Sequence, residues 1–272
     1  MAVVSAIVVS YQTGPRLREC LYALWADPAV DEIIIVDNGN PPDKRRWIVN
    51  FAGRCDKAEL VQPGENLGFG QGVNFGAQLA RGDQFLVINP DAVMRQGSVA
   101  AMQAAAAGRA SPWIVGGRIF DTAGREERGC RRRELTLARA LLSAFGWNTW
   151  TLENTPPPSG PVPMPVISGA FFLTSAESFW TLEGFDDDYF LHVEDIDLCR
   201  RCRAAGGEVI YTPLAGALHY GATSRVSSQT VARHKANGLK TYFLRWAGSP
   251  IERGLVRLLV PLMQGLARLR AG

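Results

Sequence analysis

Short apolar runs alternate with amphipathic segments along the first 120 residues of the chain. Four runs rich in Val, Ile, Leu and Phe have the length and composition typical of buried strands, and they lie at residues 3–9, 32–36, 85–88 and 113–120. Segments with a helical spacing of apolar residues separate them. This alternation predicts an α/β fold in which helices cover both faces of a mostly parallel sheet.

Polar side chains directly follow three of the predicted strands. They are Ser10 and Tyr11 after the first strand, Asp37 after the second, and Asn89 and Asp91 after the strand at residues 85–88. Ligands bind beyond the carboxyl ends of the strands in open α/β sheets, so these residues are candidates for one binding site. Asn-Pro-Asp is also ordinary turn chemistry, and the strand ends therefore do not establish a site by themselves.

Residues 65–77 form a glycine-rich segment that includes Asn66, Gly68 and Asn74. A dinucleotide-binding fingerprint would follow an apolar strand near the start of the chain, whereas this segment follows Pro63-Gly64 and comes later. Its glycines are instead expected to let the backbone and the next helix approach a ligand or the sheet closely.

The second half of the chain contains an acidic cluster and a late histidine. A strand is predicted at residues 166–173, and a helix is predicted from Asp195 onward. Glu194, Asp195 and Asp197 lie at the start of that helix, where the macrodipole favours negative charge, so their simplest role is to stabilise the helix terminus. His219 follows a strand predicted at residues 208–212, where a histidine is usually structural.

Residues 121–165 are predicted to form a partly mobile insertion, because six prolines between residues 154 and 165 exclude a regular element there. The insertion also carries an arginine cluster, for which an anionic partner and simple solvation are both open interpretations. The cluster consists of Arg125, Arg128, Arg131, Arg132 and Arg133.

The composition indicates a globular protein, and we expect a cytoplasmic location and no nucleic-acid partner. The 272 residues are 47% hydrophobic and carry a formal net charge of +3. No uncharged apolar run reaches the length of about 18 residues that a membrane-spanning helix needs, and no signal peptide is recognised. The five cysteines lack framework spacing, and Cys199-x-x-Cys202 is interpreted as a pair of packing cysteines.

The spacing of apolar residues at 251–269 predicts an amphipathic helix. Its arginines, among them Arg253 and Arg257, lie outside the apolar face. Pro261 is expected to kink or interrupt this helix. Two interpretations remain open. The helix lies on an anionic membrane surface, or it packs on its own domain or on a second subunit of a homodimer.

The order and spacing of these residues resemble the family 2 glycosyltransferases with a GT-A fold, most closely the rhamnosyltransferase-like branch of bacterial cell-surface polysaccharide synthesis. The resemblance covers about residues 3–225. It rests on Val8-Val9-Ser10-Tyr11, Val36-Asp37-Asn38, Glu65-Asn66-Leu67-Gly68 with Asn74, Asn89-Pro90-Asp91, Gly184-Phe185-Asp186, Glu194-Asp195-Ile196-Asp197-Leu198 and His219.

The resemblance implies an inverting, metal-dependent glycosyltransferase that acts on a glycan or lipid-linked acceptor, with dTDP-rhamnose as the leading donor and a UDP-sugar next. Asp195 is the implied base, with Glu194 beside it, and Asp91 and His219 are the implied ligands of Mg²⁺ or Mn²⁺. Asn89 departs from the Asp-x-Asp motif of the family and is expected to face the nucleotide. The implied donor-binding residues are Ser10, Tyr11, Asp37, Asn66, Gly68, Asn74, Asn89 and Asp91.

The resemblance also implies a division of the chain. Residues 1–110 would bind the nucleotide-sugar, residues 111–225 would form the acceptor and catalytic half of the same domain, and residues 226–272 would be a helical extension at the inner membrane surface. Two other classes of function fit the sequence less well. A nucleotidyltransferase would carry a basic glycine-rich loop after the first strand, where Ser10-Tyr11-Gln12-Thr13 stands instead. A non-catalytic binding module would not need Asp91, Asp195 and His219 together.

Overall fold

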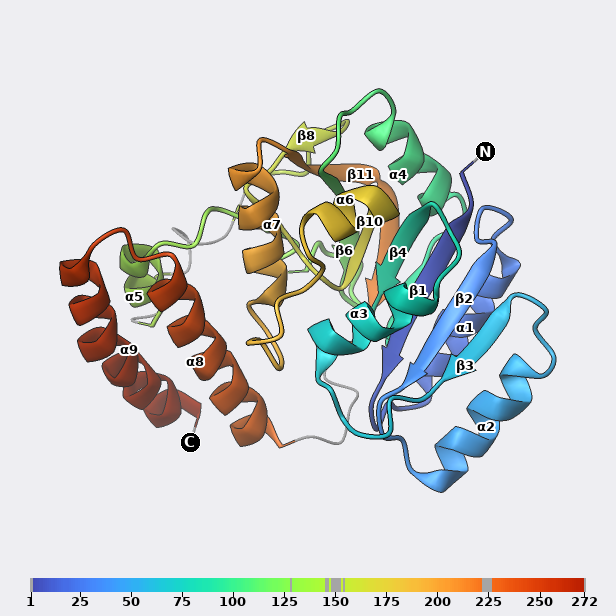
Figure 1. Cartoon of the computed structure of the whole chain (residues 1–272), viewed down its shortest axis with the longest axis horizontal. Coiled ribbons are helices and arrows are strands. Elements are labelled where there is room, and N and C mark those ends of the chain that lie inside the picture. The colour runs from blue at the N-terminus through green and yellow to red at the C-terminus, as the bar shows by residue number, and fades with distance from the viewer. Residues whose placement is uncertain are drawn as a thin grey trace.

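A nine-stranded sheet forms the centre of the computed structural model, which describes residues 2–127, 129–144, 147, 153, 155–221 and 227–271 (Figure 1). Within these residues the strand order is β3-β2-β1-β4-β10-β6-β11-β5, and β8 pairs with β11 beside this path. The strands of the sheet are β1 (Val4–Ser10), β2 (Glu32–Asp37), β3 (Ala58–Val61), β4 (Gln84–Ile88), β5 (Ala92–Met94), β6 (Trp113–Phe120), β8 (Val162–Pro163), β10 (Phe171–Ser175) and β11 (Glu208–His219). The helices are α1 (Arg16–Ala26), α2 (Pro42–Ala52), α3 (Phe69–Leu79), α4 (Ser98–Ala106), α5 (Leu137–Ala144), α6 (Ala176–Thr181), α7 (Glu194–Ala204), α8 (Ser228–Arg245) and α9 (Pro250–Ala271).

The first half of the sheet is parallel. β1 pairs in parallel with β2 and β4, and β2 pairs in parallel with β3. Every residue of β1 and β2 is buried, as apolar strands covered on both faces should be. The predicted α/β fold with a mostly parallel sheet and flanking helices is therefore confirmed. All five cysteines are buried free thiols, which agrees with their interpretation as packing residues.

Helix α3 packs closely on this part of the sheet through its glycines. A Cβ atom at Gly72 would lie 2.8 Å from Val9 Cγ1, and one at Gly76 would lie 2.8 Å from Ile7 Cγ2. Each glycine costs about 1 kcal/mol of helix propensity relative to alanine, and close packing on the sheet offsets that cost. The glycine-rich segment thus brings a helix onto the sheet, one of the two roles expected of it.

The predicted strand at residues 166–173 is wrong, because this apolar run forms two strands with different partners. β9 (Val166–Ile167) pairs with β7 (Arg131–Arg132) in a separate two-stranded sheet, whereas β10 runs antiparallel between β4 and β6. A second correction concerns β11, which continues beyond residue 212 through an irregularity between Thr212 and Gly216 and ends at His219.

Parts of segment 121–165 form regular structure, namely β7, α5 and β8. The prediction that the prolines exclude a regular element at residues 154–165 is wrong, because β8 pairs there with β11. Arg131 is 4% exposed, and its Nε donates to Glu126 Oε1 at 2.7 Å. Arg125 forms an ion pair with Asp121 at 2.9 Å. These two members of the arginine cluster are therefore paired within the chain, and Arg128 lies outside the described residues.

Helices α8 and α9 lie side by side, on the other side of the molecule from α2 and β3 (Figure 1). The predicted interruption of the last helix at Pro261 is wrong, since α9 continues through it, and the alternative of a kink stays a prediction. Pro261 removes a single backbone donor, and Val256 and Val260 in the preceding turns are buried, which supports the helix there. No helix in the described part of the chain is both long and apolar enough to span a membrane.

Candidate functional site

The carboxyl ends of β1 and β2 carry a closed network of polar groups. Ser10 and Asp37 are register partners at these ends. Burial alone would raise the pKa of the Asp37 carboxyl, but hydrogen bonds and the charge of Arg45 hold it below its usual value. Asp37 is therefore a fixed, ionised group. Its donors are the backbone N–H groups of Gly39 and Asn40 and the side chains of Asn40, Arg45 and Gln62.

Asn38 joins this network to the glycine-rich segment. Its Nδ2 donates to Asn66 Oδ1 and to the Gly68 carbonyl, each at 2.9 Å, and its Oδ1 accepts from the Leu67 N–H at 3.0 Å. Gly68 has a φ of +82°, and a Cβ there would lie 2.2 Å from the Phe190 carbonyl oxygen, so the position requires glycine. Asn66 and Gly68 thus shape the loop beside the strand ends, and their contact with a donor stays a prediction.

Tyr11 and Asn74 are the two other predicted donor-binding residues of this region. The Tyr11 hydroxyl accepts a hydrogen bond from Gln12 Nε2 at 3.1 Å. The Asn74 amide engages the backbone of Phe185, since its Nδ2 donates to the carbonyl at 2.7 Å and its Oδ1 accepts from the N–H at 2.8 Å. Asn74 thereby fixes the segment that leads to α7, and its role toward a donor stays a prediction.

Asn89 and Asp91 meet His219, the last residue of β11. Asp91 Oδ1 lies 3.2 Å from His219 Nε2, and Asn89 Nδ2 lies 3.4 Å from the same nitrogen. On the other side of the ring, Nδ1 lies 2.7 Å from Glu127 Oε2. Burial alone would lower the pKa of His219, but the hydrogen bonds to Asp91 and Glu127 raise it to about 10. The imidazole is therefore held between two carboxylates, one of which the sequence did not single out.

This arrangement fits a hard divalent cation. Asp91 and His219 converge, and together they offer a carboxylate oxygen and an imidazole nitrogen. A carboxylate behind the second ring nitrogen, here Glu127, is the usual support of a metal-binding histidine. Among the described residues, no group of three or more His, Cys, Asp or Glu side chains is arranged to hold a metal ion. A cation here would therefore need further ligands from a bound substrate or water.

Glu194 and Asp195 open α7, which begins one residue before its predicted start. The backbone before them is strained, because the non-glycine residues His192 and Val193 have φ values of +68° and +77°. The Asp195 carboxylate accepts a hydrogen bond from the Gly169 N–H at 3.0 Å and lies 3.5 Å from Arg132 Nη1. This carboxylate is thus held in one orientation, and 13% of its side chain remains exposed.

Glu194 differs from its neighbour in its surroundings. It is 5% exposed, and its Oε2 has no hydrogen-bond partner within the described residues. Burial, together with the negative charge of Asp195, raises the pKa of the Glu194 carboxyl to about 8. Glu194 therefore keeps its proton to a higher pH than an exposed glutamate does, which favours Asp195 as the candidate base of the pair.

Residues 168–170 link this pair to the Asn89–Asp91 segment. The Gly169 N–H donates to Asp195, and the Ala170 carbonyl accepts from the Asn89 N–H at 2.9 Å. A Cβ at Gly169 would lie 2.9 Å from Asp195 Cβ, so glycine permits this approach. The break between β9 and β10 therefore brings the candidate base and the candidate metal ligand to one edge of the sheet. The sequence signal for it was Ser168-Gly169 within an apolar run.

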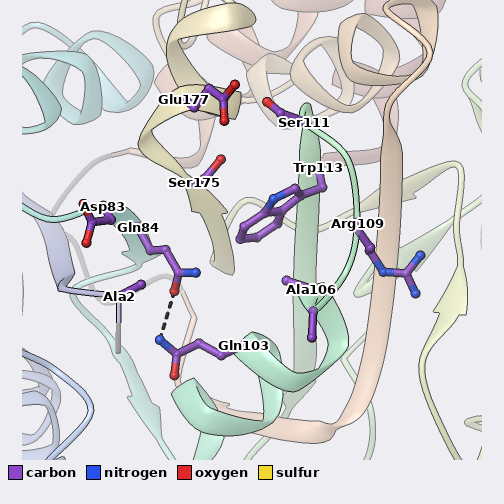
Figure 2. A pocket seen from close by; sticks show the side chains of 11 residues that line it. Ala2, Asp83, Gln84, Gln103, Ala106, Arg109, Ser111, Trp113, Ser175 and Glu177 are labelled. Atoms are coloured by element: carbon purple, nitrogen blue, oxygen red, sulfur yellow. Dashed lines mark hydrogen bonds between the residues drawn. The ribbon is translucent and has the colours of Figure 1, made fainter.

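A polar hollow lies at the opposite edge of the sheet (Figure 2). It is bordered by the first residues of β4 and β6 and the last residue of β10, and Gln103 Nε2 donates to Gln84 Oε1 at 3.0 Å there. Its arginine, Arg109, forms an ion pair with Glu208. None of the predicted catalytic or donor-binding residues lines it, so this hollow is separate from the candidate active site.

The family model described as glycosyl transferase family 2 matches residues 5–182, and the chain therefore belongs to this family of glycosyltransferases. It is 29% identical, over 86% of its own length and 82% of the relative's, to the N-acetylglucosaminyl-diphospho-decaprenol L-rhamnosyltransferase of Mycobacterium tuberculosis (strain CDC 1551 / Oshkosh).

Solved structures support the fold. The mannosyltransferase PcManGT from Pyrobaculum calidifontis, in complex with GDP-Man and Mn²⁺, matches 98% of this chain and 73% of its own at 16% identity and a TM-score of 0.63. GalNAc-T7 with UDP, GalNAc and Mn²⁺ matches 90% of this chain at 14% identity and a TM-score of 0.65, and this chain spans 50% of it. The predicted family and the GT-A fold are therefore confirmed.

Proposed function

We propose that this protein is an inverting glycosyltransferase that moves rhamnose from dTDP-rhamnose to a hydroxyl of a lipid-linked diphosphate acceptor in cell-surface glycan synthesis. The observation that carries the proposal is the link through residues 168–170 between Asp195 and Asn89, which supports a base and a donor-phosphate site at one edge. The similarity to a rhamnosyltransferase whose name specifies N-acetylglucosaminyl-diphospho-decaprenol supports the choice of sugar and acceptor.

In this proposal Asp195 removes the proton of the acceptor hydroxyl as its oxygen attacks the anomeric carbon. The new bond from oxygen to that carbon forms while the bond to the diphosphate breaks, and the nucleoside diphosphate leaves with the electron pair. A single displacement inverts the anomeric configuration. The Gly169 N–H and Arg132 orient the Asp195 carboxylate, so the residue needs little rearrangement before reaction.

Mg²⁺ or Mn²⁺ is the proposed cofactor, with Asp91 and His219 as its protein ligands. A bound cation would offset the negative charge that develops on the departing diphosphate. His219 Nε2 must lose its proton before it can act as a ligand, and the raised pKa of His219 means that protons compete for this position. Metal affinity should therefore fall as the pH is lowered.

Residues 1–110 are proposed to hold the donor, residues 111–225 the acceptor, and residues 226–272 to form an extension that meets the cytoplasmic face of a membrane as a peripheral anchor. Ile251, Leu255 and Leu258 form an exposed apolar stripe on α9. Arg253 and Arg257 are exposed on other sides of the same helix, and an arginine that reaches an anionic surface would add about 1 kcal/mol of attraction.

A transfer assay tests the proposal. The full chain is given dTDP-rhamnose, UDP-N-acetylglucosamine or GDP-mannose with an N-acetylglucosaminyl-diphospho-lipid, in Mg²⁺ or in a chelator, and products are identified by mass spectrometry. Transfer of rhamnose is expected in the samples with Mg²⁺ and not in those with the chelator. Transfer from a UDP-sugar instead would overturn the donor, and unchanged transfer in the chelator would overturn the metal.

A further inference from the structure

Two positively charged side chains lie near the Asp195 carboxylate. Arg132, from β7, lies 3.5 Å from the carboxylate, and Lys235, from α8, interacts electrostatically with both Arg132 and Asp195. Burial and the charge of Asp195 raise the pKa of the Glu194 carboxyl, so Glu194 adds less negative charge to this cluster than an exposed carboxylate would. The charges of this cluster are therefore not balanced by the described residues around it.

Helix α8 is held against the segment that precedes Asp195, which fixes the position of Lys235. A Cβ at Gly238 would lie 2.8 Å from the His192 carbonyl oxygen, and the His234 ring stacks on Phe190 with a centroid distance of 4.5 Å. Lys235 follows His234 and lies one helical turn before Gly238, so it shares this side of the helix.

The amino group of Lys235 makes no hydrogen bond or ion pair with another described residue. The residue as a whole is exposed, so a ligand can reach it, yet nearby protein and the charge of Arg132 lower the pKa of its amino group despite the opposing effect of Asp195. An ammonium group in such surroundings is stabilised by an added anion.

We propose that Arg132 and Lys235 bind the diphosphate of the acceptor and so place a hydroxyl of its first sugar at Asp195. The inference rests on the proposed function, in which the donor diphosphate occupies the Asp91 and His219 end of the site. The acceptor brings a second diphosphate, separated from the reacting hydroxyl by one sugar ring. The second diphosphate would therefore lie close to the base, where Arg132 and Lys235 supply positive charge.

Kinetics with paired acceptors test this inference. Lys235→Met and, as a matched control on the same helix, Lys240→Met are compared using an N-acetylglucosaminyl-diphospho-lipid and octyl N-acetylglucosaminide, which lacks phosphate. Lys235→Met should raise KM for the diphosphate acceptor about 10- to 100-fold, as expected for a charge-assisted hydrogen bond, and should leave the phosphate-free acceptor and donor hydrolysis unchanged. An equal rise in KM for both acceptors would overturn the inference.

A binding measurement separates failure of this inference from failure of the proposed function. Octyl diphosphate is titrated calorimetrically into wild type, Lys235→Met and Lys240→Met. A Kd at least about tenfold weaker in Lys235→Met alone is expected even if no sugar transfer is detected. The same Kd in all three proteins would contradict the inference, whatever donor the enzyme uses.

Discussion

The two ends of the site differ in how their polar groups are satisfied. At the donor corner, formed by residues 10, 37–40 and 66–68, the Asp37 carboxylate and the Asn38 amide have their partners within the chain. At the acceptor corner, formed by Arg132, Glu194, Asp195 and Lys235, a buried oxygen of the Glu194 carboxyl has no hydrogen-bond partner among the described residues, and the Lys235 side chain is exposed. An unsatisfied buried group costs stability, so this oxygen supports the proposal that a substrate completes the acceptor corner.

Asp195→Asn should have the largest effect on turnover. Loss of a general base lowers kcat at least about 100-fold, whereas the donor Kd should stay within about twofold because the proposed donor site lies at the other corner. Steady-state kinetics and donor titration measure the two quantities, with Asp187→Asn, an exposed acid in the preceding segment, as the control. A comparable loss of donor affinity in Asp195→Asn would place this residue at the donor corner instead.

Asp91→Ala should remove metal-dependent donor binding. Donor at about 100 times its Kd stabilises wild type by about 2.7 kcal/mol, and the corresponding rise in Tm with Mg²⁺ present should vanish in this variant. Asp195→Asn is the matched control and should keep the rise. A full donor-induced rise in Asp91→Ala would mean that the metal, if any, is held elsewhere.

Glu194→Gln should change the pH dependence of stability. The raised pKa of Glu194 means that the folded protein binds more protons than the unfolded chain between about pH 4.5 and pH 8, so wild type loses stability as the pH rises through this range. The negative charge of Asp195 raises the pKa of Glu194 further and so adds to this loss, whereas the positive charge of Arg132 lowers that pKa and opposes it. Denaturant titrations from pH 5 to pH 9 should show that the free energy of unfolding of Glu194→Gln rises relative to that of wild type by a few kcal/mol over this range. Parallel curves would show that Glu194 is ionised throughout.

Gly72→Ala should destabilise the fold near the donor corner. The added Cβ would meet Val9 Cγ1 at 2.8 Å, and overpacking of this kind costs about 1–3 kcal/mol. Gly254→Ala is the matched control, since it also lies within a helix but its Cβ would meet no atom within 4 Å. Denaturant unfolding measures both. An equal stability change in the two variants would contradict the close packing of α3.

The combined change Ile251→Gln and Leu258→Gln should weaken binding to anionic vesicles about tenfold, because it removes two exposed apolar side chains from α9. Both residues are exposed, so the fold should be unaffected. Leu214→Gln, at a 64% exposed leucine on β11, is the control for lost surface hydrophobicity. Unchanged co-sedimentation with vesicles would contradict membrane binding by the α9 stripe and would favour its role as a contact with protein.

The donor corner was largely predictable from the sequence because it is assembled from strand ends. Apolar runs that stop at Ser10, Asp37 and Asn89 predict both the strands and the edge at which they end. Their detailed partners were not predictable, since Arg45 and Gln62 reach Asp37 from a helix and from the end of a third strand.

The acceptor corner depends on contacts that no local pattern reveals. Ser168-Gly169 marks a break in the apolar run at residues 166–173, but it does not reveal the new strand partners, because these are chosen by non-local packing. Glu127, Arg132 and Lys235 reach the site from segments distant in sequence, and only the fold brings them together. The order of motifs therefore predicted Asp195 as the base, but it did not predict the residues that surround it.

The stereochemistry of the product tests the central claim, a single displacement assisted by Asp195, most directly. Wild type is supplied with dTDP-rhamnose, Mg²⁺ and the N-acetylglucosaminyl-diphospho-lipid, and the one-bond C1–H1 coupling of the transferred sugar is measured by NMR and compared with that of the donor. The account predicts an inverted anomeric configuration in a product that Asp195→Asn forms at least about 100 times more slowly. A retained configuration would contradict it.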